Sequence, residues 1–255
     1  MGFIIIYFVF KFKKMEYFSD EEKEIINNAK KYIIKIFKDD SSGHDAEHSL
    51  RVYKTALEIS SSIIKEQENN KNFKLNLFII GLSALLHDVD DYKIKNYNKE
   101  NPFQNLELFL KENKITNEND IKLIKEIISE ISFKAGETEI PKSLEGKIVQ
   151  DADRLDAIGA IGIARAFAFG GSKKRKLYDD NIIELSKRNF ETFDMTKVSF
   201  EQYKNKHTDT VTHFYEKLLK LESMMNTEFG KKIAKKRTDL MKRYLSDLFD
   251  EIIEK

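Results

Sequence analysis

A run of fifteen residues, LFIIGLSALLHDVDD from Leu77 to Asp91, constrains the fold of this chain more than any other stretch. Its first ten residues leave no polar face on a helix, because almost every side chain up to Leu86 is apolar. Such a helix belongs in the middle of a core, surrounded by other helices. His87 and Asp88 follow its apolar part, and an unpaired buried carboxylate is costly. Asp88 therefore needs a cation or a strong donor nearby, and a metal ion would satisfy both residues.

The composition favours an all-α protein and excludes several functional classes. The 255 residues include only two prolines and ten glycines, whereas Lys, Glu, Ile, Leu and Asn are abundant. A net charge of +1, from 44 basic and 43 acidic residues, argues against a strongly basic nucleic-acid-binding protein or a polybasic membrane module. The absence of cysteine excludes disulfides, thiolate ligands and a thiol nucleophile. It is consistent with a reducing compartment, and we expect a cytoplasmic protein.

We expect one helical domain over residues 15–255, preceded by an apolar extension at residues 1–14. The apolar run from Phe3 to Phe10 is far shorter than the ~20 residues that span a bilayer, so no membrane span is predicted. It also lacks the preceding basic charge and the following small-residue cleavage site of a secretory signal. We interpret the extension as dispensable, and a peripheral or partner-binding tail is the alternative. No repeat or change in composition indicates a second domain.

Helical periodicity predicts further helices around the central one. Ser19 to Glu22 form a capping-box sequence before apolar residues that recur as far as Phe37. A helix beginning near Asp45 would place His48 on its buried stripe. Another helix is expected to begin at Asn101-Pro102 and to continue through Leu110. Further helices are expected from about Asn119 to Ile131, from Ser143 to Gly170 as one long stretch, from Tyr203 to Leu221, and from Thr227 to Ile253. The charged segment from Lys173 to Met195 is expected to be flexible or to form a lid.

Three polar groups interrupt these apolar helical faces. They are His48, the pair His87-Asp88, and the acidic cluster of Asp151, Asp153 and Asp156. Each alone has an ordinary explanation, since a lone core histidine is usually hydrogen-bonded and an acidic cluster is usually solvated. Together, two imidazoles and two carboxylates on three helices make a four-ligand set. Nitrogen and oxygen ligands without sulfur suit one divalent ion, such as Mn, Fe, Co, Ni, Zn or Mg, with positions left open for water.

The segments that carry these residues are HDAEHSLRV (44–52), LLHDVDD (85–91) and DADRLDAIGAIGIAR (151–165). Together and in this order they resemble the HD-domain superfamily of metal-dependent phosphohydrolases, whose signature is H…HD…D. The resemblance runs from about Ser42 to Gly171. It implies a mostly helical fold and hydrolysis of a phosphate ester or anhydride, often of a nucleotide.

Carried over by position, the resemblance implies four metal ligands, His48, His87, Asp88 and Asp153. Asp153 is chosen because the last ligand of the superfamily is the Asp of an Ala-Asp-(Arg)-Leu segment. On a helix Asp153 and Asp156 share a face as i, i+3 neighbours, whereas Asp151 points elsewhere. No histidine lies between residues 88 and 153, where dinuclear members have additional His ligands, so a mononuclear hydrolase is favoured.

The resemblance also suggests residues that act on the substrate. Asp91 lies four residues after His87, where relatives place an acidic or basic residue, and we interpret it as the general acid–base candidate. The alternative is a helix-end carboxylate that only hydrogen-bonds a neighbour. The candidates for phosphate contact are Lys93, Lys134, Arg154 and Arg165. Arg51, three residues after His48, is as plausible as a structural ion-pair partner of a motif carboxylate.

The resulting prediction is a single-metal phosphohydrolase acting on a nucleotide or a related small phosphate compound. Two reactions remain open: cleavage of a phosphomonoester, and attack on the α-phosphate of a triphosphate with release of pyrophosphate. A non-catalytic binding or regulatory module that keeps the metal is the alternative. No extended basic stripe indicates nucleic-acid binding, and the oligomeric state is left open.

Overall fold

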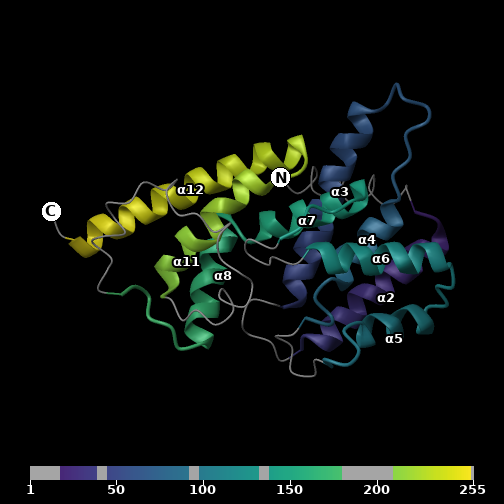
Figure 1. Ribbon diagram of the computed structural model, residues 1–255, viewed down its shortest axis with the longest axis horizontal. Coiled ribbons are helices and arrows are strands. Elements are labelled where there is room, and N and C mark those ends of the chain that lie inside the picture. Colours follow the sequence, from purple (N-terminus) through teal and green to yellow (C-terminus); the bar gives the residue numbers. More distant parts are fainter. Residues whose placement is uncertain (1–17, 39–44, 92–97, 132–137, 180–208, 254–255) are drawn as a thin grey trace, which may run out of the picture.

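The computed structural model describes residues 18–38, 45–91, 98–131, 138–179 and 209–253, and this part of the chain contains helices and no β-strand (Figure 1). In chain order the elements are α2 (Asp20–Ile36), α3 (Ala46–Glu66), α4 (Leu77–Leu86), α5 (Gln104–Glu112), α6 (Glu118–Ile131), α7 (Leu144–Asp156), α8 (Gly159–Ser172), α11 (Thr210–Glu216), the 3-10 helix η3 (Leu218–Met224) and α12 (Glu228–Ile253). The predicted all-α class is confirmed. The apolar extension at residues 1–14 and most of the predicted flexible segment lie outside the described residues.

Helix α4 lies at the centre of the core, as its apolar sequence predicts. Every residue from Ile79 to Leu86 is buried, and the helix packs against α2, α3, α6 and α7. Burying one Leu or Ile side chain contributes about 1.5–3 kcal/mol, so this helix is a major source of stability. It ends at Leu86, and the chain turns through His87 to Asp90.

Helices α2 and α3 each begin with a side-chain cap. The predicted capping box at α2 is present: Glu22 N–H donates to Ser19 Oγ at 3.2 Å, and Ser19 N–H donates to Glu22 Oε2 at 2.7 Å. At α3 the Asp45 carboxylate accepts the N–H of His48 at 2.8 Å. The cap of α3 therefore fixes the turn of backbone that carries His48.

The predicted start of α5 at Asn101-Pro102 is wrong. The helix begins at Gln104, and its N-cap residue makes no side-chain hydrogen bond. Its N-terminus is instead capped by Asp90, whose Oδ1 accepts the N–H of Asn105 and whose Oδ2 accepts that of Leu106, both at 2.9 Å. These are the N–H groups that a local cap would satisfy, and a negative charge there is favoured by the helix dipole.

The long helix predicted from Ser143 to Gly170 is two helices. It breaks after Asp156, where Ile158 is extended and Gly159 has a φ of +79°, a left-handed conformation that favours glycine. A side chain at Gly159 would also meet the Cγ atom of Arg237 at 2.9 Å. The break lets α8 turn away from α7 and return Arg165 toward the end of α7.

The C-terminal part also differs from the prediction of two amphipathic α-helices. Residues 203–208 lie outside the described part, α11 ends at Glu216, and the chain continues as η3. The buried leucines Leu218 and Leu221 share a side of a 3-10 helix, which has three residues per turn. The predicted second helix is confirmed as α12, one residue later than expected.

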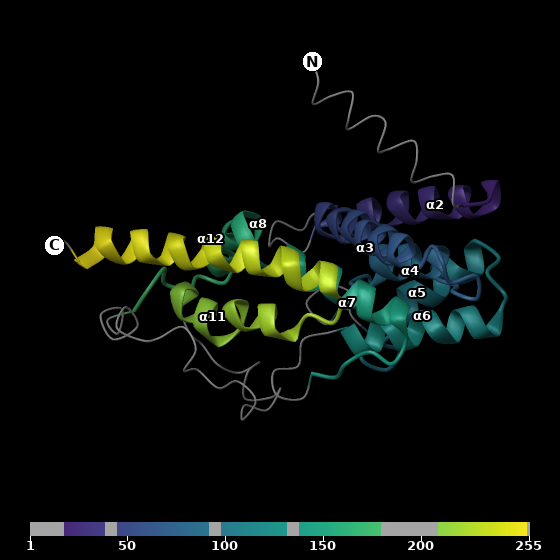
Figure 2. The same ribbon diagram turned by 90° about the horizontal axis from the view of Figure 1, so that it is seen from above.

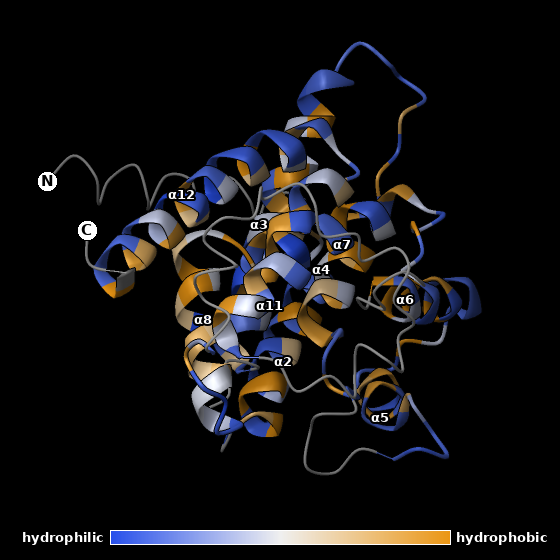
Figure 3. Cartoon of the chain, turned by 60° about the vertical axis from the view of Figure 1, so that its left-hand side comes forward, coloured by the Kyte–Doolittle hydropathy of each residue, from blue (hydrophilic) through white to orange (hydrophobic). Residues whose placement is uncertain are grey.

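The helices form two groups with α7 between them. In Figures 1 and 2, α2 to α6 lie at one end, whereas α8, α11 and α12 lie at the other. Helix α7 contacts α3, α4 and α6 on one side and α8 and α12 on the other. Hydrophobic and hydrophilic residues alternate along α6 and α12 in Figure 3, as expected for helices with one buried face. Within the described residues, every helix is too short or too polar to cross a membrane.

Candidate metal centre

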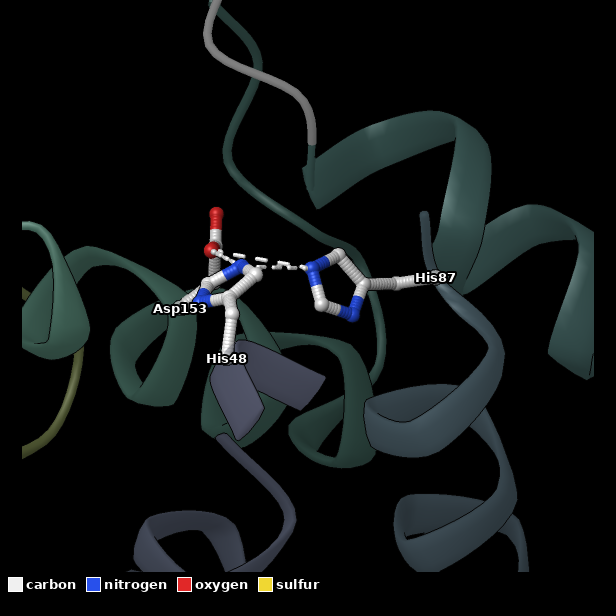
Figure 4. A group of neighbouring side chains, drawn as sticks. All are labelled: His48, His87 and Asp153. Carbon is white, nitrogen blue, oxygen red and sulfur yellow. Dashed lines mark hydrogen bonds and ion pairs between the residues drawn. The ribbon is translucent and has the colours of Figure 1, made fainter. Parts of the chain in front are cut away.

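Three helices bring two imidazoles and a carboxylate together at the junction of the two groups. His48 lies in the first turn of α3, His87 directly follows α4, and Asp153 lies on α7 (Figure 4). The Nε2 atoms of His48 and His87 are 3.2 Å apart. Asp153 Oδ1 lies 3.3 Å from the Nε2 of His48 and 3.7 Å from that of His87. The three ligand atoms thus converge on one point.

Asp88 brings a second carboxylate to the two imidazoles. Its Oδ2 lies 3.5 Å from Nε2 of His48 and 3.4 Å from Nε2 of His87. The two imidazoles are almost fully buried, but the side chains of Asp88 and Asp153 are 15% and 28% exposed. A ligand from solvent would therefore approach the group from its carboxylate side.

In each imidazole, the contact made by the outer nitrogen, Nδ1, determines that Nε2 faces the other ligand atoms. His48 Nδ1 lies 2.7 Å from Asp156 Oδ2, and His87 Nδ1 lies 3.0 Å from the carbonyl oxygen of Ala84. A carboxylate and a carbonyl only accept, so each Nδ1 carries the proton. The two neutral rings then point Nε2 lone pairs at each other and at two carboxylates, an arrangement that requires a cation or a shared proton. Holding the outer nitrogen in this way is typical of metal-ligating histidines.

The separations also fit one ion. Neighbouring ligand atoms about 2.0–2.2 Å from a common centre lie roughly 2.8–3.6 Å apart in octahedral or tetrahedral coordination. The measured separations of 3.2 to 3.7 Å lie close to that range. Two nitrogen and two oxygen donors suit a divalent transition metal. His48, His87 and Asp153 therefore fit a single ion, and Asp88 contacts both imidazoles of this set.

Electrostatics within the group follow from the close contacts. Burial alone would lower the pKa of His87, but the neighbouring Asp88 and Asp153 outweigh it and raise this pKa to about 9. Burial alone would raise the pKa of Asp153, but His48 and His87 lower it to about 2. In the absence of an ion, the neighbouring carboxylates thus favour the protonated, positively charged form of His87 at the position where the ligand atoms meet.

Asp156, the last residue of α7, does not join the ligand atoms. Its carboxylate accepts from His48 and from the guanidinium groups of Arg51 and Arg165. Burial would raise its pKa, but these donors hold it well below the usual range. Arg51 is thus the ion-pair partner of a motif carboxylate, as one reading of the sequence anticipated. Arg165, a predicted phosphate contact, also lies at this carboxylate, with its side chain 18% exposed.

Asp151 and Arg154 lie on another face of α7, toward the C-terminal part of the chain. Asp151 Oδ1 accepts the N–H of Asn226 at 2.8 Å, and Oδ2 accepts the N–H and hydroxyl of Thr227 at 2.7 Å each. The guanidinium of Arg154 is buried and donates to the carbonyl of Met224. Arg154 is therefore committed to a structural contact, contrary to its predicted contact with phosphate.

Replacing Asp151 by asparagine is expected to lower the free energy of unfolding by about 1–3 kcal/mol. The reason is that the amide nitrogen would face N–H and O–H groups whose hydrogen bonds the carboxylate now accepts. Metal binding should stay near the wild-type level, since the Asp151 carboxylate bonds Asn226 and Thr227 and contributes no atom to the group of ligand atoms. Chemical denaturation followed by circular dichroism measures the first effect, and metal titration measures the second. Loss of metal from a folded variant would contradict this placement.

Asp91 lies at the edge of the site. Its N–H donates to the carbonyl of Asp88 at 3.1 Å, and its side chain is half-buried at the end of the turn that carries His87 and Asp88. The two predicted phosphate contacts Lys93 and Lys134 lie outside the described residues.

Sequence reasoning missed two carboxylates. The first, Asp90, caps α5 fifteen residues away. The second, Asp156, was considered only as a competing ligand, whereas it contacts the outer nitrogen of His48. A signal for the second was present, because Arg51 and Asp156 each lie three residues after a predicted ligand, His48 and Asp153, on two different helices. Side chains at that spacing share a helix face and meet where the ligands meet.

Comparison with known proteins agrees with this fold and this group of residues. The family model described as the HD domain matches residues 45–158, which include all four predicted ligands. YpgQ of Bacillus subtilis is 35% identical over 226 residues, which is 87% of this chain and 90% of YpgQ. The crystal structure of YpgQ in complex with ADP aligns with a TM-score of 0.61 and 31% identity, covering 91% of this chain and 96% of that one.

Two further crystal structures have the same fold. An HD-superfamily hydrolase from Bacillus thuringiensis aligns with 35% identity and a TM-score of 0.62, covering 92% of this chain and all of that one. A protein from Lactobacillus plantarum aligns with 32% identity and a TM-score of 0.73, covering 93% of this chain and all of that one. From the ligand group, the helical fold and these matches over nearly the whole chain, this protein belongs to the HD-domain superfamily.

Proposed function

We propose that this protein is a divalent-metal-dependent phosphohydrolase that acts on a nucleotide or a related small phosphate compound. The observation that carries the proposal is the pair of Nε2 atoms 3.2 Å apart, with Asp88 and Asp153 beside them and both Nδ1 atoms engaged elsewhere. A relative described as an HD-superfamily hydrolase supports the reaction class. The complex of YpgQ with ADP supports a nucleotide as the ligand.

The roles follow from the placement of the residues. His48, His87, Asp88 and Asp153 would hold the ion, which when bound supplies a Lewis acid that lowers the pKa of water and offsets phosphate charge. Asp91, next to Asp88 in space, would handle a proton on the attacking water or the leaving oxygen. The proposal keeps Lys93 and Lys134 as phosphate contacts and omits Arg154, whose guanidinium is buried against Met224.

A screen of nucleoside mono-, di- and triphosphates with added Mn²⁺, Co²⁺, Zn²⁺ or Mg²⁺ tests this function. Phosphate and pyrophosphate are scored separately, because their ratio distinguishes monoester cleavage from attack on an α-phosphate. We expect metal-dependent turnover of at least one nucleotide, and none in His87→Ala. Nucleotide binding without turnover under every metal would instead support a non-catalytic binding module.

Metal affinity is expected to rise with pH below about 9. The raised pKa of His87 means that an ion must displace a proton from this ring at neutral pH. Because the protonated fraction falls as the pH approaches about 9, the apparent affinity should increase by up to tenfold per pH unit, the limit for displacement of about one proton. Titration with Zn²⁺ against a chromogenic chelator at several pH values measures the slope. An affinity that is independent of pH between neutrality and about 9 would contradict the prediction.

A further inference from the structure

We propose that Asp156 is a positioning residue that orients His48 for metal binding, and that Arg51 and Arg165 hold its carboxylate in place. The inference rests on the proposed metal centre. Asp156 Oδ2 lies 2.7 Å from His48 Nδ1, on the side of the ring opposite the ligand group. Arg51 donates Nε to Oδ1 at 2.7 Å and Nη2 to Oδ2 at 3.0 Å, a two-pronged contact of fixed geometry.

The carboxylate is held by groups from separate elements. Arg51 and His48 come from α3, and Arg165 reaches it from α8, with Nη1 2.7 Å from Asp156 Oδ2. The Asp156 side chain is only 5% exposed, so water competes little with these donors. Since the helix break after Asp156 allows α8 to bring Arg165 to this point, the corner between α7 and α8 is part of the support of the site.

The two histidines of the ligand group are oriented by different means. The Nδ1 proton of His87 is accepted by the backbone carbonyl of Ala84, which no side-chain substitution removes. The Nδ1 proton of His48 is accepted by the side chain of Asp156. The orientation of one imidazole can therefore be altered by mutation while all four predicted ligands stay in place.

Alanine at position 156 would remove the acceptor that selects the tautomer of His48. Asp156 Oδ2 accepts from His48 Nδ1 and from Arg165 Nη1, so the single amide oxygen of asparagine could keep both contacts, whereas alanine keeps neither. Without this acceptor the neutral ring can carry its proton on Nε2, which is the atom that must bind the ion. The substitution thus acts on the metal through His48 without altering a ligand.

Zn²⁺ affinity, measured by competition with a chromogenic chelator, tests the proposal. We expect Asp156→Ala to bind Zn²⁺ roughly 10–100-fold more weakly than the wild type, the usual cost of losing such a supporting contact. Asp151→Ala is the matched control, since it removes another buried carboxylate of α7 and should keep its Zn²⁺ affinity. Wild-type affinity in Asp156→Ala, or equal losses in both variants, would overturn the proposal.

Nitrogen-15 NMR of the histidine rings gives a second readout that is free of any metal. In metal-free wild-type protein at alkaline pH, we expect His48 to carry its proton on Nδ1, and in Asp156→Ala we expect a shift toward Nε2. A wild-type His48 protonated on Nε2 would overturn the proposal even if the variant failed to fold. Neither measurement uses turnover, so an absence of phosphohydrolase activity would refute the proposed function and leave this inference standing.

Discussion

Replacing His87 by alanine is expected to reduce bound divalent metal to background in a protein that keeps its helical content. The substitution removes the Nε2 atom that faces His48 across 3.2 Å, whereas the apolar residues of α4 remain buried. Asp88→Ala should have the same effect, because it removes the oxygen within 3.5 Å of both rings. Elemental analysis of the purified protein measures the metal, and circular dichroism measures the helical content.

His213→Ala is the matched histidine control, since His213 lies on α11 outside the ligand group. It should retain full metal. Asp153→Asn should abolish metal-dependent activity, because it replaces the one carboxylate that α7 contributes to the group. Full metal occupancy in both His87→Ala and Asp88→Ala would refute the assignment of this centre, and a structure with Asp151 or Asp156 bound to the ion would refute the choice of Asp153.

Replacing Asp91 by asparagine is expected to lower turnover by at least about 100-fold while metal content and nucleotide affinity stay nearly normal. The size follows from general acid–base catalysis, which contributes roughly 10²–10⁴-fold. A loss of 100-fold corresponds to about 2.7 kcal/mol of barrier. The substitution preserves the size of the side chain and leaves His87 and Asp88 unchanged, so the loss should appear in kcat. Steady-state kinetics and equilibrium nucleotide binding separate the two effects.

The neighbouring carboxylate provides the control for this variant. Asp90 caps α5 through the N–H groups of Asn105 and Leu106, so Asp90→Asn should reduce stability and leave kcat within a few-fold of the wild type. Turnover of Asp91→Asn within a few-fold of the wild type would reduce Asp91 to a structural role. Loss of metal from Asp91→Asn would show that the ligand set has been assigned incorrectly.

The central helix and the positions of the histidines could be predicted because they depend on local patterns. A helix that is apolar on all sides is stable only inside the core, so the residue that follows it, His87, must lie at the edge of the core. Periodicity placed His48 on a buried face for the same reason. That these residues meet follows from the packing of α3, α4 and α7, which the structure shows.

The errors concern contacts that join distant parts of the chain. The carboxylate that caps α5 comes from Asp90 in a preceding turn, and nothing in the local sequence of α5 indicates it. Spacing shows that Asp151 and Arg154 share a helix face, but only packing shows that this face meets residues 224–227. The break at Gly159 was missed because the apolar residues on both sides are compatible with one continuous helix.

The contacts between α7 and the C-terminal part of the chain determine when the metal centre can be completed during synthesis. All four predicted ligands precede residue 158, the end of the matched family region. The partner of Arg154, however, is made 70 residues later, and the partners of Asp151 follow directly after it. Arg237 of α12 also donates to the carbonyl of Leu155. Until residues 224–227 leave the ribosome, Asp151 and Arg154 of α7 lack these hydrogen-bonding partners, and burying their charged groups would be costly. We therefore expect the nascent chain to acquire its metal only near the end of translation, although every ligand has long been exposed by then.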